Sequence, residues 1–290
     1  MVRPSVTATV VGGLGNQLFT FAAAAVLARA QGAPLRIDTS TVAHRKSDAD
    51  TIRAFQLDCS WEDVRRLPLH ASVLRAMLTR IRWRVARSGR CLGVETFSAA
   101  SPEDDASLLF REAPVQVRGF FQTTRYAQML WPETSKRRLQ IASPSSWLVD
   151  RIHEADEARP IVLHVRRGDY LQHRSFGLLS RRYYVDRIDE CYHRVGDRPI
   201  WVFSDQPGLA EDWRLPGVSE IRSPRGAAED LLLMSYGSAI VAANSTFSWW
   251  SAWMSDPSTH VFMPRPWFQG EGREGMMLDE WTIRDAIWER

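Results

Sequence analysis

Three short polar segments, each directly after an apolar run, hold the side chains of this 290-residue chain that are best suited to chemistry. The segments are His164–Asp169, Phe203–Asp205 and Asn244–Ser248. The apolar runs before them have the length and composition of buried strands. In open α/β sheets, ligands bind outside the carboxyl ends of the strands. We therefore expect the three segments to line one crevice.

The first segment reads His164-Val-Arg-Arg-Gly-Asp169 and places two guanidinium groups beside a strand end. Adjacent residues of an extended chain point to opposite faces, so Arg166 and Arg167 cannot both face the crevice if the strand continues. We expect one of them to bind ligand and the other to bind a neighbouring carboxylate. Arg166 lies on the same face as His164 and is our candidate for the ligand. The alternative is a purely structural Arg–Asp pair at the entrance of the loop.

The third segment, Asn244–Ser248, is expected to run from a strand into a helix. Ser245 or Thr246 would then stand at or near the helix N-cap. The free backbone amides and the positive end of the helix dipole make such a terminus an anion site. A simple capping role is the alternative for both residues. The aromatic residues that follow are expected in the core rather than in a sugar platform: Trp249, Trp250 and Trp253.

A glycine-rich stretch near the start of the chain, Gly12–Gln17, is expected to form a tight loop after the first strand. It begins like the dinucleotide-binding pattern G-x-G-x-x-G, but Leu18 stands where the third glycine belongs. The Gly-Lys-Ser/Thr of a P-loop is missing as well. The glycines still allow the backbone to approach a ligand closely, and Asn16 can both donate and accept hydrogen bonds there.

The sequence indicates no metal site, redox site or nucleic-acid partner. Asp48 and Asp50 form a D-x-D pattern, but no strand precedes them, and we interpret this stretch as a solvated loop. The net charge of +3 arises from 37 basic and 34 acidic residues without a basic stripe, which disfavours nucleic-acid binding. The cysteines form no C-x-x-C pair, which fits a reducing compartment: Cys59, Cys91 and Cys191.

The first residues predict a strand rather than a targeting segment. Met1–Val10 has no basic stretch followed by an apolar core and a cleavage site. The most apolar stretch nearby, Phe19–Ala30, is too short to span a membrane and contains Arg29. We therefore expect a cytoplasmic protein without a transmembrane segment, or one that is peripheral at the inner face of the cytoplasmic membrane.

Strands and helices alternate along much of the sequence. The chain opens as a βαβ unit, with a strand at 7–11, a helix at 18–31 ended by Gly32, and a strand at 35–38. In the middle, we expect helical structure at 61–86 and a strand at 115–121. From residue 160 the pattern is regular, with strands expected at 161–165, 199–203, 220–222, 239–243 and 260–263, and helices at 180–195, 227–236, 246–254 and 278–288.

This alternation predicts parallel sheets that are covered by helices on both faces. With a linker expected at 143–159, the chain divides into a domain at 1–150 that carries the glycine loop and a domain at 151–290 that binds the ligand. The predicted fold class is α/β, with two facing Rossmann-like domains and a ligand cleft between them. The closing helix is expected to pack back on the first domain.

These segments together resemble the α1,2-fucosyltransferase family. The matching blocks keep the family order, span nearly the whole chain, and end with a highly specific block. They are Gly12–Phe19, His164–Tyr170, Phe203–Asp205, Glu229–Leu231 with Met234-Ser235, and Ala243–Trp253. Gln206 is a departure, because many relatives have a second acidic residue there, so a nucleotide contact at this position is not carried over.

The resemblance implies a GT-B fold and an inverting transfer of L-fucose from GDP-β-L-fucose without a metal or other cofactor. It implies that Arg166 binds the β-phosphate and that Ser245–Phe247 adds phosphate contacts. His164 and Asp205 are implied to lie near guanosine, and Asn16 to reach the reaction centre. The donor-binding residues implied in this way are Gly13, Gly15, Asn16, His164, Arg166, Asp205, Asn244, Ser245, Thr246 and Phe247.

The chemistry of such a transfer fits these residue types. Without a metal, arginine and helix-end amides must take up the charge that develops on GDP. The acceptor hydroxyl must lose its proton to a nearby base, for which Asp169 and His173 are the candidates. Together with Asn16, whose role the resemblance implies, Arg166 and Asp169 are the expected catalytic residues. The resemblance implies an acceptor with a terminal galactose, in an oligosaccharide or a lipid-linked glycan of a bacterial surface.

Two other functions fit part of the pattern. An α1,6- or protein O-fucosyltransferase shares the arginine motif, although the block at 244–250 disfavours it, and linkage analysis of the product separates the two. A non-catalytic module that binds a GDP-sugar would bind GDP but would not release it from the donor when a galactoside is added.

Overall fold

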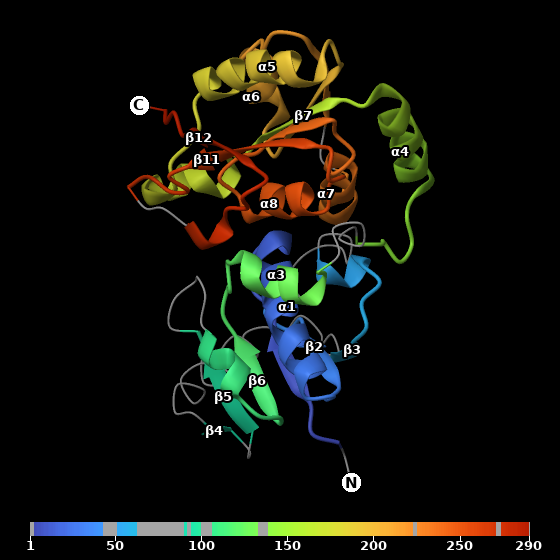
Figure 1. Cartoon of the computed structure of the whole chain (residues 1–290), viewed down its shortest axis with the longest axis vertical. Helices are drawn as coiled ribbons and strands as arrows, with labels where there is room; N and C mark the ends of the chain where they lie inside the picture. Colours follow the sequence, from blue (N-terminus) through green and yellow to red (C-terminus); the bar gives the residue numbers. More distant parts are fainter. Residues whose placement is uncertain are drawn as a thin grey trace, which may run out of the picture. The chain divides into compact units, whose positions relative to one another are not determined.

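The computed structural model describes residues 3–42, 51–62, 90–91, 94–99, 106–132, 139–222, 225–270 and 274–289. The chain folds as two compact units (Figure 1). The first comprises Met1–Lys46 and Leu57–Leu130, and the second comprises Ser47–Gln56 and Trp131–Arg290. Ser47–Gln56 and residues 131–150, predicted to belong to the first domain, thus group with the second unit.

The first unit contains a six-stranded sheet with the order β3-β2-β1-β6-β5-β4. All neighbouring strands are parallel except the pair β4 and β5. The strands are β1 Val6–Thr9, β2 Leu35–Asp38, β3 Ser60–Glu62, β4 Arg90–Cys91, β5 Val94–Ser98 and β6 Val115–Arg118. The helices are α1 Leu14–Ala30, α3 Thr124–Leu130 and the 3₁₀ helix η4 Ala106–Phe110. The helix expected at 61–86 is wrong at its start, where Trp61 lies in β3, and residues 63–86 lie outside the described residues.

Helix α1 begins at Leu14, four residues earlier than the sequence suggested. The expected glycine loop is therefore short, because Gly12 makes the turn at a φ of +71° and Gly13 is already the N-cap. The helix is buried almost throughout, since its residues are alanine and large apolar side chains. It ends as predicted before Gly32, whose φ of +57° is the left-handed conformation that stops helices.

The second unit contains a six-stranded, wholly parallel sheet with the order β12-β11-β10-β7-β8-β9. The strands are β7 Ile161–Val165, β8 Ile200–Ser204, β9 Val218–Arg222, β10 Ala239–Val241, β11 His260–Arg265 and β12 Thr282–Asp285. From β7 the chain continues outward to β8 and β9 on one side, and then returns to β10, β11 and β12 on the other. The strand order therefore reverses between β7 and β10, which is the switch point at which such sheets bind ligands.

The helices of the second unit lie on both faces of its sheet, with α5 and α6 on one face and α7 and α8 on the other (Figure 1). They are α4 Ser146–Ala158, α5 Arg181–Val195, α6 Pro207–Asp212, α7 Ala227–Met234 and α8 Thr246–Trp253. The 3₁₀ helices are η2 Ile52–Ala54, η6 Gly168–Gln172, η7 Arg174–Phe176 and η8 Glu274–Met276. None of the helices in the described part of the chain is long and apolar enough to cross a membrane.

Two expectations for the second unit are wrong. The linker at 143–159 is instead mostly helix α4, whose N-cap Ser145 accepts a hydrogen bond from the backbone N–H of Leu148 at 3.1 Å. The segment 278–288, expected to be a closing helix, contains no helix. It contains β12, which pairs with β11 from Phe262 to Arg265. The β-branched pair Thr282-Ile283 favours a strand there. The backbone hydrogen bonds to the edge of β11 stabilise that strand.

The core of the second unit contains both central strands and the tryptophans of α8. Every residue of β7 and β8 is buried. The rings of Trp249 and Trp253 stack with centroids 5.4 Å apart, and the edge of Trp131 meets Trp250 at 6.0 Å. All three α8 tryptophans are fully buried. The prediction that they form core rather than a sugar platform is confirmed.

Candidate functional site

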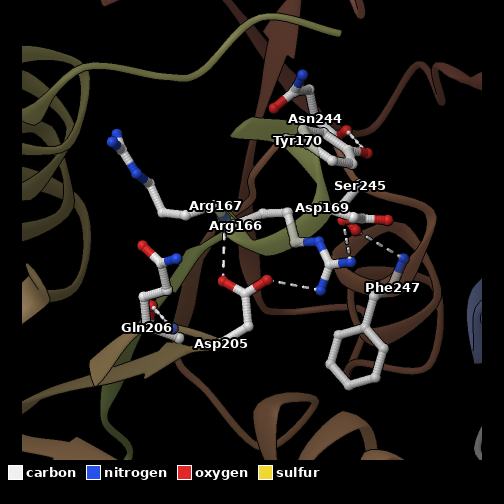
Figure 2. Close-up of polar contacts among 10 residues, drawn as sticks. Arg166, Arg167, Asp169, Tyr170, Asp205, Gln206, Asn244, Ser245 and Phe247 are labelled. Atoms are coloured by element: carbon white, nitrogen blue, oxygen red, sulfur yellow. Dashed lines mark hydrogen bonds and ion pairs between the residues drawn. The ribbon is translucent and has the colours of Figure 1, made fainter. Parts of the chain in front are cut away.

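The three polar segments follow adjacent strands at the carboxyl edge of the second sheet. His164–Asp169 ends β7, Asp205 follows β8, and Asn244–Ser248 follows β10. Because the sheet order places β7 between β10 and β8, the segments converge on the switch point. Figure 2 shows Arg166, Asp205, Tyr170 and Ser245 gathered there. The predicted convergence of these segments is confirmed.

Arg166 lies between two carboxylates at this edge. Its Nη2 atom is 2.6 Å from Oδ1 of Asp169, and its Nη1 atom is 2.8 Å from Oδ2 of Asp205. The guanidinium carbon lies 5.5 Å from the centroid of the Tyr170 ring. With 29% of its side chain exposed, Arg166 is held in place and still open to a ligand. This is the geometry of an arginine prepared for an anion.

Arg167 points to the opposite side of the chain (Figure 2). Its guanidinium, only 10% exposed, pairs with the carboxylate of Glu289 and lies 5.7 Å from the centroid of Trp213. The alternation expected of an extended chain is thus observed, and Arg167 is the arginine that pairs with a carboxylate. Glu289 was missed because we expected a helix at the end of the chain, which gave no reason to place it near β7.

Asp205 anchors the loop that follows β7. Its Oδ1 atom accepts a hydrogen bond from the backbone N–H of Arg167 at 2.9 Å, while Oδ2 pairs with Arg166. A Cβ atom built on Gly168 would lie 2.3 Å from Oδ2 of Asp205, which is far inside van der Waals contact. The glycine therefore allows the carboxylate to lie against the loop backbone. Gln206 uses its own backbone N–H to bind Oγ of Ser204 at 3.0 Å.

The start of α8 forms the other side of the switch point. Ser245 is the N-cap, as predicted, and its Oγ atom accepts from the backbone N–H of Phe247 at 3.3 Å. Thr246 and Phe247 form the first helical positions and are half-buried. Asn244 is buried, and its side-chain amide donates to the carbonyl of Phe176 at 2.8 Å. Asn244 therefore holds two loops together, in addition to any contact with a ligand.

Tyr170 connects the loop after β7 to the loop after β10. Its hydroxyl donates to the carbonyl oxygen of Asn244 at 2.8 Å (Figure 2). Burial raises the pKa of Tyr170 to about 12, although the neighbouring Arg166 opposes that rise. The phenol therefore stays protonated and remains a hydrogen-bond donor at neutral pH.

His164 is a buried, neutral ring beside Arg166. Burial and, to a smaller extent, the positive charge of Arg166 together lower the pKa of His164 to about 3. The ring centroid lies 5.4 Å from that of Phe247. Among the described residues, the Nδ1 atom of His164 has no hydrogen-bond partner. A buried polar atom without a partner is costly, so a ligand that binds it would stabilise this site.

The predicted residues of the first unit lie at the corresponding switch point of the other sheet, between β1 and β6. Asn16 is in the first turn of α1, and its Oδ1 atom accepts from Nε2 of Gln122, which follows β6, at 2.9 Å. Gly13 is exposed, whereas Gly15 is buried in α1. Gln122 was missed by the sequence analysis. Gln122 follows a predicted strand. The same criterion, a polar residue just after a strand, selected the candidates between His164 and Ser248 and would also have selected Gln122.

The two candidate bases differ in surroundings. Asp169 is 59% exposed and paired with Arg166, whereas His173 is exposed with its ring centroid 5.2 Å from that of Phe176. Within the described residues, no group of three or more histidine, cysteine or acidic side chains is arranged to hold a metal ion. Asp48 and Asp50 lie outside the described residues.

The comparisons with known proteins identify the family. Residues 119–284, more than half of the chain, match the model of glycosyl transferase family 11. The chain belongs to glycosyl transferase family 11. The matched segment includes Gln122 and the whole switch point of the second sheet, from His164 to Phe247. The predicted membership of a fucosyltransferase-type family is thereby confirmed.

Two family relatives of known role come from Escherichia coli. The O-antigen biosynthesis glycosyltransferase WbnK is 28% identical over 295 aligned residues, which cover 93% of this chain and 97% of the relative. An α1,2-colitosyltransferase is 29% identical over 170 residues, which cover 54% of this chain and 57% of that enzyme.

Solved structures show that this family 11 chain has the GT-B fold. The α1,6-fucosyltransferase NodZ, co-crystallised with GDP, has a TM-score of 0.51 at 15% identity, over 88% of this chain and 93% of NodZ. A glycosyl transferase of family 9 from Veillonella parvula has a TM-score of 0.51 at 10% identity, over 99% of this chain and 88% of that protein. At such identities the likeness shows the fold alone, and it confirms the predicted fold class.

Proposed function

We propose that this family 11 enzyme transfers L-fucose from GDP-β-L-fucose to O2 of a terminal galactose, with inversion at the anomeric carbon. The acceptor would belong to a bacterial surface glycan, as the relationship to an O-antigen glycosyltransferase supports. The observation that carries the proposal is that Arg166 and the N-terminus of α8 follow neighbouring strands, β7 and β10, at the switch point of the second sheet. An arginine fork and helix-end amides suit a diphosphate leaving group.

The transfer would proceed by a single displacement. The acceptor oxygen forms a bond to the anomeric carbon, and the bond from that carbon to the β-phosphate oxygen breaks on the opposite face. The electron pair of the broken bond goes to GDP. Arg166 and the positive end of the α8 dipole stabilise the negative charge that develops there. Since these groups already supply positive potential, the reaction needs no metal ion.

The remaining residues of the second unit have supporting roles in this scheme. Neutral His164 offers Nδ1 to the nucleoside rather than a charge to the phosphates. Asp205 would lie near guanosine in this scheme, and both of its oxygens also hold the loop of Arg166 and Arg167. The donor-binding surface of this proposal also includes Asn244 and Ser245.

The acceptor proton goes to Asp169 in our scheme, with His173 as the alternative base. A carboxylate suits this role if it can move to within hydrogen-bond reach of the hydroxyl. Asp169 is the more exposed of the two carboxylates that contact Arg166, so it has the freedom to do so. Asn16, with Gly13 and Gly15, contributes to transfer from the first unit.

A second candidate differs only in the donor sugar. The similarity to an α1,2-colitosyltransferase supports transfer of colitose, which is L-fucose without the 3-hydroxyl group. The two functions need the same leaving group and the same linkage. They differ in whether the site recognises the 3-hydroxyl, and a site built to bind that hydroxyl rejects a sugar that lacks it.

A donor and acceptor screen tests the proposal. The purified enzyme is given GDP-fucose or GDP-colitose with a set of galactosides, and released GDP and the product linkage are measured. We expect GDP release that depends on the galactoside and an α1,2 linkage by NMR. Full activity in EDTA is expected as well, and its loss with recovery in Mn²⁺ or Mg²⁺ would contradict the metal-free scheme. GDP binding without turnover on any acceptor would favour a binding module.

A further inference from the structure

Each terminal nitrogen of Arg166 contacts one carboxylate of the protein itself. Nη2 lies against Asp169 and Nη1 against Asp205, at 2.6 Å and 2.8 Å (Figure 2). Each terminal nitrogen keeps a second N–H group, whereas the third nitrogen, Nε, is buried. A guanidinium binds phosphate best through two parallel hydrogen bonds from one edge. The carboxylates on the two terminal nitrogens therefore compete with a diphosphate for such an edge of Arg166.

Asp205 is the carboxylate that stays. Besides the ion pair, it accepts a hydrogen bond from the backbone N–H of Arg167 at 2.9 Å. It also lies so close to the loop that Gly168 has no room for a Cβ atom. Its side chain is 24% exposed. Loss of Asp205 would leave an unsatisfied backbone N–H and would free the whole loop.

Asp169 is held much less firmly. Its side chain is 59% exposed, and its one ion pair in the described part of the chain is to Arg166, three residues away. Exposed pairs of this kind contribute little, because water and salt screen them. A diphosphate, with more charge and more acceptor oxygens, competes well for the same nitrogen.

We propose that Asp169 occupies the place of a phosphate oxygen on Arg166 and is displaced when the donor binds, while Asp205 remains as the fixed positioning partner. This inference rests on the proposed function, because it requires a diphosphate ligand. Asp169 then competes with the donor and with the product GDP for one guanidinium edge. Displacement also frees the Asp169 carboxylate to act as a base only once the donor is bound.

The consequence is that two similar substitutions change GDP affinity in opposite directions. Asp169→Asn removes the competing charge and is expected to tighten GDP binding about two- to fivefold, the scale of an exposed ion pair. Asp205→Asn is expected to weaken GDP binding about tenfold, because Arg166 loses its fixed partner. Guanosine has no phosphate, so Asp169→Asn is expected to leave its affinity unchanged.

Isothermal titration of the purified full chain tests this. GDP and guanosine are titrated into the wild type, Asp169→Asn, Asp169→Ala and Asp205→Asn. Asp197→Asn is the charge-matched control, since Asp197 is exposed just before β8, at the opposite edge of the sheet. Tighter GDP binding in both Asp169 variants, without a change for guanosine or in the control, supports the proposal.

The outcomes that overturn the inference are distinct from those that overturn the proposed function. If the wild type binds GDP but Asp169→Asn and Asp169→Ala bind it equally well or more weakly, Asp169 is not a competitor, and the fucosyltransferase proposal is unaffected. A similar gain for guanosine, or in Asp197→Asn, would also reject displacement. If the wild type does not bind GDP at all, the proposed donor itself is wrong.

Discussion

Gly168 and Asp205 lie so close together that a Cβ atom on the glycine would be 2.3 Å from the carboxylate Oδ2 atom. This contact joins the loop after β7 to the loop after β8 and fixes the carboxylate that holds Arg166. A methyl group at this position must push Asp205 away. Since the same carboxylate also binds the backbone N–H of Arg167, its displacement would loosen both arginines.

We therefore expect Gly168→Ala to weaken GDP binding about tenfold and to lower transfer by at least as much. Gly208→Ala is the matched control, because that glycine lies in α6 with open space around its Cβ position. There, alanine should leave binding unchanged and raise stability slightly. Titration with GDP and thermal unfolding of both variants check this. If Gly168→Ala binds GDP with wild-type affinity, GDP binding does not depend on the position of the Asp205 carboxylate against Gly168.

Substitution of Arg166 tests the leaving-group assignment. Arg166→Ala is expected to lower the transfer rate about 10²–10³-fold, the usual loss when one charged contact to a developing anion is removed. Arg166→Lys should fail as well, since a point charge replaces a fork that can bind two oxygens and pair with Asp205. Steady-state GDP release measures both. Activity within a few-fold of wild type in either variant would reject the assignment.

A control for this experiment is Arg182→Ala, in which an arginine of α5 with 79% of its side chain exposed is removed. It tests whether loss of one positive charge anywhere on the second unit has an effect. We expect no more than a small change in donor affinity from this variant. Circular dichroism of all three variants verifies that the fold is intact.

The sequence predicts the second unit better than the first for a physical reason. Apolar runs such as Ile161–Val165 are buried on both faces of a parallel sheet. The change from apolar to polar residues therefore locates the end of each strand, and the polar residues after it can be assigned to one edge of the sheet. The alternation that separates Arg166 from Arg167 follows from the strand geometry alone. These local rules are independent of the rest of the chain.

Contacts between distant segments could not be predicted in this way. Glu289 reaches Arg167 only because β12 adds to the sheet beside β11, a pairing that the helical interpretation of 278–288 excluded. Gln122 meets Asn16 because β6 lies next to β1, although 106 residues separate the two side chains. The need for glycine at 168 likewise depends on Asp205, which comes from another strand.

Protonation of His164 links stability to pH. The ordinary pKa of 6.5 applies in the unfolded chain, whereas burial lowers the pKa to about 3 in the folded protein. Between these two pKa values, His164 binds a proton in the unfolded state but not in the folded state. The contribution of the neutral ring to stability is complete above about pH 6.5 and is lost progressively as the pH falls toward 3. At pH 5 the loss is about 2 kcal/mol.

Urea unfolding at pH 7.5 and pH 5 in the wild type and in His164→Gln measures this effect. Other groups titrate in both proteins, so their contribution cancels in the comparison. We expect the wild type to lose about 2 kcal/mol more than the variant between these pH values. The same pH dependence in both proteins would mean that His164 is protonated, or exposed, in the folded state.

Asn16 and Gln122 test whether donor binding and transfer are divided between the two units. The residues assigned to GDP all belong to the second unit, whereas Asn16 lies in α1 of the first, with its amide held by Nε2 of Gln122 at 2.9 Å. Asn16→Ala is expected to lower transfer about 10²-fold, as the loss of a positioning group does, with GDP affinity within twofold of wild type.

Gln122→Met, which removes the hydrogen-bond donor to Asn16 but keeps the side-chain volume, should lower transfer less, by about tenfold, also without a change in GDP affinity. Gln116→Met is the matched control, because Gln116 is on the neighbouring strand β6 but donates to Thr9 instead of Asn16. Titrations with GDP and transfer assays on these variants and on Arg166→Ala compare the loss of GDP affinity with the loss of transfer rate. If Asn16→Ala loses GDP binding as severely as Arg166→Ala, GDP binding is not confined to the second unit, and the start of α1 is itself part of the nucleotide site.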